Sequence, residues 1–269
     1  MSTIRSNSSG INSIEEIRDR ITDATFLKAR PDAARDEVHT ETKKLDRLDA
    51  NSSIEYVIIH PVHTRTSSGN RQAEKLLYIC HAGVGSCIDN TSVRRWQKHA
   101  NKNNVDIFLH NYPGYGDTTG RSTEDRICQD ALQLLKEVYR QEQEVVLFGE
   151  SIGCGPTMYL ASSNETRNLG IKQMVLLSPL TSLLDLLVTL QPKYGLSAPS
   201  AYAKIITILE EAQVNLGHHK GKAREGYDSF RSLKLVEKLH VKDILVVHGK
   251  GNETIPVELA KICSLIILI

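Results

Sequence analysis

Short apolar runs alternate with amphipathic stretches along most of the chain. Six of the runs predict strands, at 54–59, 75–80, 105–110, 144–148, 173–177 and 243–248. The last five runs are almost continuously apolar, which is typical of parallel strands covered on both faces. Three stretches between them have helical spacing, at 93–101, 122–141 and 155–162. This alternation predicts the α/β class, with a doubly wound, mostly parallel sheet.

Two stretches depart from the alternation. Residues 1–50 predict a polar and partly helical extension, in which a capping box at 13–16 begins an amphipathic helix that runs to about Leu27. Residues 51–269 form the predicted main domain. Within this domain, a long segment at about 185–231 separates the last two predicted strands. We interpret it as a long, partly helical insertion.

The charge balance and the cysteines narrow the function classes. The 269 residues carry 33 Lys and Arg against 32 Asp and Glu, a net charge of +1, which argues against a strongly basic nucleic-acid-binding protein. The five cysteines contain no CxxC pair and are odd in number, as in a reduced compartment. The chain has no apolar stretch of about 18 residues and no secretory signal. We expect a cytoplasmic protein without a transmembrane segment or nucleic-acid partner, and leave peripheral membrane contact open.

One motif carries candidate chemistry. The run Gly149-Glu150-Ser151-Ile152-Gly153 follows a predicted strand and precedes a predicted helix. In such a G-x-S-x-G turn, a strained backbone lifts the serine hydroxyl above the sheet, and a side chain in place of either glycine would collide with the neighbouring strand and helix. The motif therefore predicts that Ser151 is a nucleophile; the alternative is a glycine-rich turn without chemistry.

Five segments, in order, resemble motifs of the α/β-hydrolase superfamily, in particular its serine esterase and thioesterase branch. They lie at 80–85 (CHAGVG), 111–116 (NYPGYG), 149–153 (GESIG), 178–180 (SPL) and 246–256 (VVHGKGNETIP). The resemblance implies that Ser151 is the nucleophile and that the backbone N–H groups of Gly83 and Ile152 form an oxyanion hole. It also implies hydrolysis of a carboxylic ester or thioester through an acyl-enzyme, with a small-molecule or acylated substrate and neither metal nor organic cofactor. The resemblance further implies that the segment at about 185–231 is a cap-like insertion that shapes the acyl pocket.

The sequence departs from the family's pattern at the catalytic acid. The position that matches the acid is Asn252, whose neutral amide cannot stabilise a protonated imidazole as a carboxylate does. Glu253, one residue later, is one alternative acid. Asp185, after the segment at 178–180, is another.

The catalytic base is also missing, because no histidine follows His248 although the family's base follows its acid. His218 and His219, in the insertion, are the pair that we expect to be able to overhang the site. The apolar tail at 264–269, if bare, would leave the edge of the sheet or the core unfinished. We therefore expect a chain that is truncated before its catalytic histidine or that has become inactive.

Three functions remain in competition. The first is a serine hydrolase of esters or thioesters. The second is a non-catalytic α/β-hydrolase-fold binding or scaffold protein that keeps the serine turn without its partners. The third is a structural module that docks through its N-terminal helix.

Overall fold

The computed structural model describes residues 42–47, 52–62, 65–66, 69–70, 73–83, 86–120, 122–182, 233–252 and 255–267. Several sequence-based predictions concern residues outside these ranges. They are the N-terminal helix, the insertion with Asp185, the pair His218 and His219, and the alternative acid Glu253. These stay predictions.

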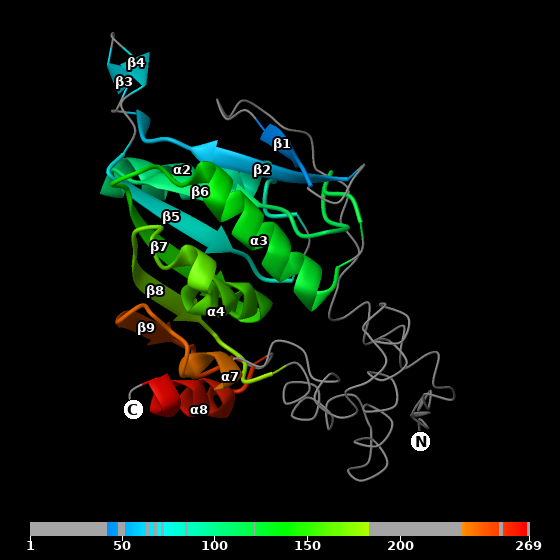
Figure 1. The fold of residues 1–269 in the computed structure, drawn as a ribbon, viewed down its shortest axis with the longest axis vertical. Helices are drawn as coiled ribbons and strands as arrows, with labels where there is room; N and C mark the ends of the chain where they lie inside the picture. The colour runs from blue at the N-terminus through cyan, green and yellow to red at the C-terminus, as the bar shows by residue number, and fades with distance from the viewer. Residues whose placement is uncertain are drawn as a thin grey trace, which may run out of the picture.

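The main sheet has seven described strands in the order β1-β2-β6-β5-β7-β8-β9 (Figure 1). Their bounds are Thr42–Asp46 (β1), Ser53–Ile59 (β2), Lys75–Cys80 (β5), Asp106–His110 (β6), Glu144–Glu150 (β7), Ile171–Leu177 (β8) and Asp243–Val247 (β9). β2 pairs with β1 and β6 in the antiparallel sense, and every pairing from β6 to β9 is parallel. A separate two-stranded ribbon joins β3 (Arg65–Thr66) to β4 (Gly69–Asn70). The mostly parallel α/β sheet is thus confirmed.

Helices lie on both faces of the sheet. The α-helices are Asn90–Asn103 (α2), Glu124–Val138 (α3), Cys154–Ser162 (α4), Leu233–Val236 (α7) and Val257–Ile267 (α8), and the 3₁₀ turns are Ser151–Gly153 (η2) and Asn164–Thr166 (η3). Figure 1 shows α3 and α4 in front of the sheet and α2 behind it. α2 packs on β2 and β6, whereas α4 packs on β7 and β8.

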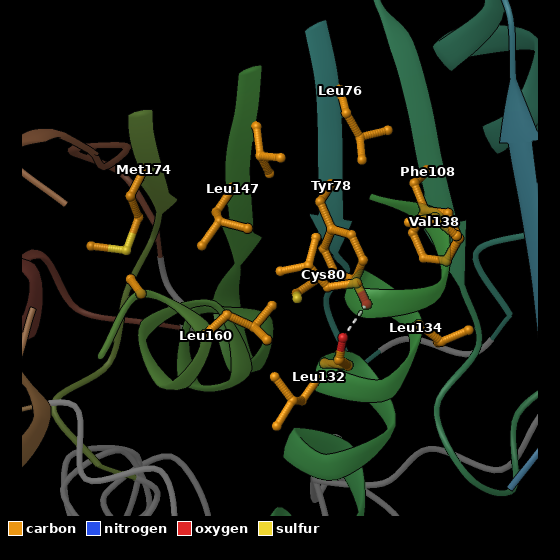
Figure 2. Close-up of a cluster of buried hydrophobic side chains, with 14 of the residues drawn as sticks. Leu76, Tyr78, Cys80, Phe108, Leu132, Leu134, Val138, Leu147, Leu160 and Met174 are labelled. Atoms are coloured by element: carbon orange, nitrogen blue, oxygen red, sulfur yellow. Dashed lines mark hydrogen bonds between the residues drawn. The ribbon is translucent and has the colours of Figure 1, made fainter. Parts of the chain in front are cut away.

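The larger core lies between the sheet and helices α3 and α4. Tyr78 of β5 is fully buried there, and its ring stacks on Phe108 of β6 with the centroids 4.8 Å apart (Figure 2). The Tyr78 hydroxyl donates a hydrogen bond to the carbonyl of Ala131 in α3 (2.8 Å). A smaller core on the opposite face packs Ile79 against α2 residues such as Val93. Successive β5 side chains therefore enter different cores, which is why the run reads as continuously apolar.

β1 is a strand that its own sequence does not predict. Its residues, TKKLD, are mostly polar, and Lys43 and Lys44 are exposed. Leu45 alone among them packs against the larger core. An edge strand that buries one side chain carries no apolar alternation, so its pairing with β2 is what makes it a strand.

Arg47, directly after β1, ties this edge of the sheet to α3. Its Nε and Nη2 donate to the two carboxylate oxygens of Asp130, at 2.7 and 2.6 Å, and both side chains are almost completely buried. Its Nη1 donates to the carbonyl of Thr119 (2.8 Å). A bidentate geometry of this kind offsets the desolvation of two buried charges. The pair therefore fixes β1, α3 and the loop that contains Thr119 in one arrangement.

The described part of the chain ends in a helix. Val257–Ile267 forms α8, which contacts β9 and α7. β9 lies at the edge of the described sheet, and its Leu245 and Val247 are 56% and 41% exposed. The apolar residues at 264–267 thus belong to a helix that packs beside this edge.

Removal of one partner from the buried pair should destabilise the protein. We expect Arg47→Ala and Asp130→Ala each to lower the free energy of unfolding by about 3–5 kcal/mol, because each removes the oppositely charged partner of a buried side chain. Urea unfolding followed by circular dichroism measures this loss.

The exposed pair Lys44–Asp117 (3.1 Å) serves as the matched control for the buried pair. Lys44→Ala should cost less than about 1 kcal/mol. Losses of that small size in both Arg47→Ala and Asp130→Ala would contradict the anchoring role of the buried pair.

Candidate active site

Ser151 stands directly after the last residue of β7, at the carboxyl ends of the parallel strands. Its φ is +56°, a left-handed conformation that residues other than glycine rarely adopt. The chain continues into η2 and α4, so the strand–turn–helix geometry of a nucleophile elbow is present. The side chain is half-buried, and its hydroxyl forms no hydrogen bond with the described residues. Strain of this kind is concentrated at functional sites.

The two glycines of the turn have no room for a side chain. A Cβ on Gly153 would lie 2.2 Å from the carbonyl oxygen of Cys80 and 2.5 Å from that of His81. A Cβ on Gly149 would lie 2.6 Å from Oγ1 of Thr157. Contacts this short do not occur for real Cβ atoms. Close packing therefore requires both glycines, as the motif predicts.

The two backbone donors predicted for the oxyanion hole lie on segments that pack against each other. β5 is the hydrogen-bonded neighbour of β7, and Gly83 follows its last residue, Cys80, by three positions. The contact of Gly153 with Cys80 brings this loop against the serine turn. Ile152 lies in the first turn of η2, where backbone N–H groups have no partner within the helix.

A third apolar cluster joins the loops at this edge of the sheet. Ile152 is buried in it, although the residue beside it, Ser151, is half-exposed. The cluster consists of Tyr112, Tyr115, Ile127, Ile152, Leu180, Ile255 and Leu259. The same loops that carry the motifs thus share one small core, which holds their backbones in place.

Two histidines are buried at the carboxyl ends of β5 and β6. His81 stacks on Tyr112 with centroids 4.0 Å apart, and the Tyr112 hydroxyl donates to the His81 carbonyl (2.8 Å). Burial lowers the pKa of His81 to about 4. Burial, with a smaller contribution from His81, lowers the pKa of His110 to about 3. Both rings are therefore neutral at pH 7, and neither hydrogen-bonds to Ser151 within the described structure.

Glu55 of β2 organises the turn at 111–116, although no local pattern marks it. Its Oε2 accepts hydrogen bonds from Nδ2 of Asn111 (2.7 Å) and from the N–H of Asp117 (2.9 Å). A Cβ on Gly116 would lie 2.5 Å from the same Oε2. Glu55 and Asn111 are 56 positions apart, so only the sheet brings them together.

Asn252 lies on the loop after β9, and both ends of its amide are engaged. Nδ2 donates to Oγ of Ser178 (3.1 Å), and Oδ1 accepts from the N–H of Ile255 (3.0 Å). Ser178 directly follows β8, has φ of +51°, and is half-buried. Sequence reasoning assigned Ser178 no role; the only signal is a polar residue at a strand end, within the segment at 178–180.

His248 directly follows β9, which is not a neighbour of the strand that leads to Ser151. Its Nδ1 donates to the carbonyl of Gly249 (2.9 Å), and its Nε2 has no hydrogen-bond partner among the described residues. β8 separates β9 from β7, a distance of about 10 Å between strands. His248 is thus not placed to accept a proton from Ser151.

Other kinds of site are not evident in the described ranges. They contain no group of three or more His, Cys, Asp or Glu side chains that could hold a metal ion. None of the helices described is long and apolar enough to cross a bilayer. A pocket of about 590 Å³ lies at the amino ends of β5 and β7, between residues 73–75 and 140–144, which is the opposite end of the sheet from Ser151.

The close approach at Gly153 predicts a large effect of one methyl group. We expect Gly153→Ala to lower the free energy of unfolding by about 3 kcal/mol, because the backbone carbonyls of Cys80 and His81 cannot move aside. Gly251→Ala is the matched control, since its Cβ would meet nothing within 4 Å. A thermal melt of both variants measures the difference, and equal melting temperatures would contradict the packing argument.

The buried histidines predict that stability falls in mild acid. Below pH 6.5 the unfolded chain binds protons at His81 and His110, whereas the folded protein resists protonation until about pH 4 and 3. The free energy of unfolding should therefore fall as the pH drops through this window, by up to about 1.4 kcal/mol per pH unit for each histidine. His110→Phe should make the slope shallower in urea unfolding at pH 7, 6 and 5. An unchanged slope would show that His110 is protonated in the folded state.

Comparisons with known proteins agree with this geometry. No protein-family model matches the chain. Human alpha/beta hydrolase domain-containing protein 17B is 30% identical over 146 residues, which cover 49% of this chain and 48% of that protein. Protein bem46 of Schizosaccharomyces pombe is 32% identical over 131 residues, covering 47% and 42%. The chain thus spans about half the length, or less, of the curated relatives that it matches.

Solved structures share the fold at low sequence identity. An alpha-beta hydrolase from Vibrio vulnificus superposes with a TM-score of 0.63 at 14% identity, covering 100% of this chain and 87% of that one. The Pyrococcus furiosus esterase superposes with a TM-score of 0.58 at 14% identity, covering 89% and 83%. Together with the sheet order, these likenesses show that the chain has the α/β-hydrolase fold.

Proposed function

We propose that this protein is a serine hydrolase of carboxylic esters or thioesters, with Ser151 as its nucleophile. The observation that carries the proposal is the left-handed backbone of Ser151 between two glycines that admit no side chain. Such strain costs about 1–3 kcal/mol, and a turn without chemistry has no need of a serine in that conformation. The hydrolase and esterase names of the relatives and structural neighbours support the same reaction class.

The reaction has two steps. Ser151 Oγ forms a bond to the acyl carbon, and the N–H groups of Gly83 and Ile152 bind the oxygen that becomes negatively charged. The bond to the leaving group then breaks, and the alcohol or thiol departs with a proton taken from water. Water attacks the acyl-enzyme in the second step, releases the carboxylic acid and restores the Ser151 hydroxyl.

The fate of the serine proton limits the rate. None of the described histidines hydrogen-bonds to Ser151, and Asn252 is already bound to Ser178. We propose that water accepts the proton in the 269-residue chain, with His218 and His219 as the alternative bases and Asp185 as the alternative acid. A site with only its oxyanion hole and substrate binding retains a rate of about 10³–10⁴ over water. The expected activity is therefore slow.

A non-catalytic binding protein is the second candidate. It is favoured by Asn252, whose amide oxygen and nitrogen both make hydrogen bonds within the described structure and whose neutral amide does not stabilise a protonated imidazole as a carboxylate does. Under either function the ligand is a small or acylated molecule.

We also propose a cytoplasmic location, which is supported by four buried free cysteines among the described residues.

A fluorophosphonate probe separates the two functions. The hydrolase predicts that the probe forms one covalent adduct on Ser151, because the phosphorus is attacked as an acyl carbon would be. Labelling is expected to be slow, at least about a thousandfold below that of an intact triad. Intact-mass measurement over hours, followed by peptide mapping, detects the adduct.

Two variants make the labelling test specific. Ser151→Ala should remove the adduct completely. Ser162→Ala, which deletes another half-buried serine hydroxyl at the end of α4, should leave labelling unchanged. If the unmodified chain stays unlabelled while its circular dichroism shows a folded protein, the binding function replaces the hydrolase.

A further inference from the structure

Two serines with strained backbones stand side by side at the carboxyl edge of the sheet. Glu150 and Leu177, the last residues of β7 and β8, are paired, so Ser151 and Ser178 occupy equivalent positions on neighbouring strands. Such strands lie about 4.8 Å apart. Among the described residues other than glycine, these two alone combine a positive φ with the position directly after a strand.

The direction of the hydrogen bond between Asn252 and Ser178 follows from a third group. The N–H of Ile255 can only donate, so the Asn252 atom that it contacts is the amide oxygen. The NH₂ group of Asn252 therefore faces Ser178, and Ser178 Oγ accepts this hydrogen bond. The proton of Ser178 remains available, because no described residue accepts it.

The sheet order places this proton on a definite side of Ser151. β5, which leads to the Gly83 loop, flanks β7 on one side, and β8, which leads to Ser178, flanks it on the other. An acyl group whose carbonyl oxygen points to the Gly83 loop directs its leaving group away from that loop. The acyl chain also points away from the loop, so one of these two substituents lies on the Ser178 side.

We infer that Ser178 donates a hydrogen bond to the leaving-group atom of the substrate and so favours oxygen esters over thioesters. The inference rests on the proposed function and names the substrate class within it. An ester oxygen is a good acceptor, whereas a thioether-like sulfur is a weak one. Asn252 is then a positioning residue, which acts by keeping the Ser178 proton free rather than by replacing a catalytic acid.

A matched pair of probes tests the inference in the complete chain. The two phosphonates share one phosphonyl group and differ in the leaving group, phenoxide in one and thiophenoxide in the other. Ser151 Oγ bonds to phosphorus, the P–O or P–S bond breaks with its electron pair, and the serine proton leaves to water. Both probes give the same adduct on Ser151, so intact mass yields the ratio of the two labelling rates directly.

Ser178→Gly removes the hydroxyl and accommodates the positive φ without strain, so the variant should fold at least as well as the parent. We expect it to lower the oxygen-to-sulfur rate ratio about fivefold, the contribution of one neutral hydrogen bond. Asn252→Asp should lower the ratio similarly although Ser178 is intact, because a carboxylate accepts the Ser178 proton. Ser162→Ala is the control and should keep the parent ratio.

The outcomes are distinguishable. Failure of both probes to label Ser151 overturns the proposed function itself. Labelling of Ser151 with an unchanged ratio in Ser178→Gly overturns the inference and leaves the hydrolase intact. A ratio that falls in Ser178→Gly but persists in Asn252→Asp overturns the positioning role of Asn252.

Discussion

The contact between Gly153 and the backbone at the end of β5 is the constraint on which the site depends. Because the Cα of Gly153 lies against the carbonyls of Cys80 and His81, the turn that carries Ser151 and the loop that leads to Gly83 share one surface. Close packing transmits this constraint with little slack, since interiors are as dense as organic crystals. A single added methyl group would separate the two segments that the proposed chemistry needs together.

Satisfied polar groups under the loops support the same geometry. Glu55 holds the turn at 111–116 through Asn111 and Asp117, and Arg47 holds the neighbouring loop through Thr119 while it pairs with Asp130. Buried polar groups that are fully partnered are rigid, because each alternative position leaves a desolvated donor or acceptor. The loops at this edge of the sheet thus depend on Glu55 and Arg47, which lie outside the serine motif.

Asn252, at the position that matches the family's catalytic acid, determines which hydrogen bonds form at the carboxyl edge of the sheet. A carboxylate at position 252 accepts hydrogen bonds only, whereas the amide of Asn252 donates to Ser178 and accepts from Ile255 at the same time. The amide therefore suits a hydroxyl neighbour better than an imidazole. Ser151, Ser178 and Asn252 follow the neighbouring strands β7, β8 and β9. Three neutral polar side chains therefore lie along this edge of the sheet, where a serine triad would include a carboxylate.

Local patterns in the sequence determined much of the fold and the position of Ser151. Continuous apolar runs predicted the parallel strands, and the spacing of glycines around Ser151 predicted a turn that the structure places after β7, because burial on both faces and tight turns leave signals within a few residues. The tertiary structure decided what depends on distant partners. β1 is a strand only because β2 pairs with it, and residues 264–267 belong to α8, a helix that contacts β9. Glu55 and Ser178 acquire their partners 56 and 74 positions away. The sequence determines the chemical type of each side chain. The partner of that side chain depends on the order and register of the strands, which no local pattern encodes.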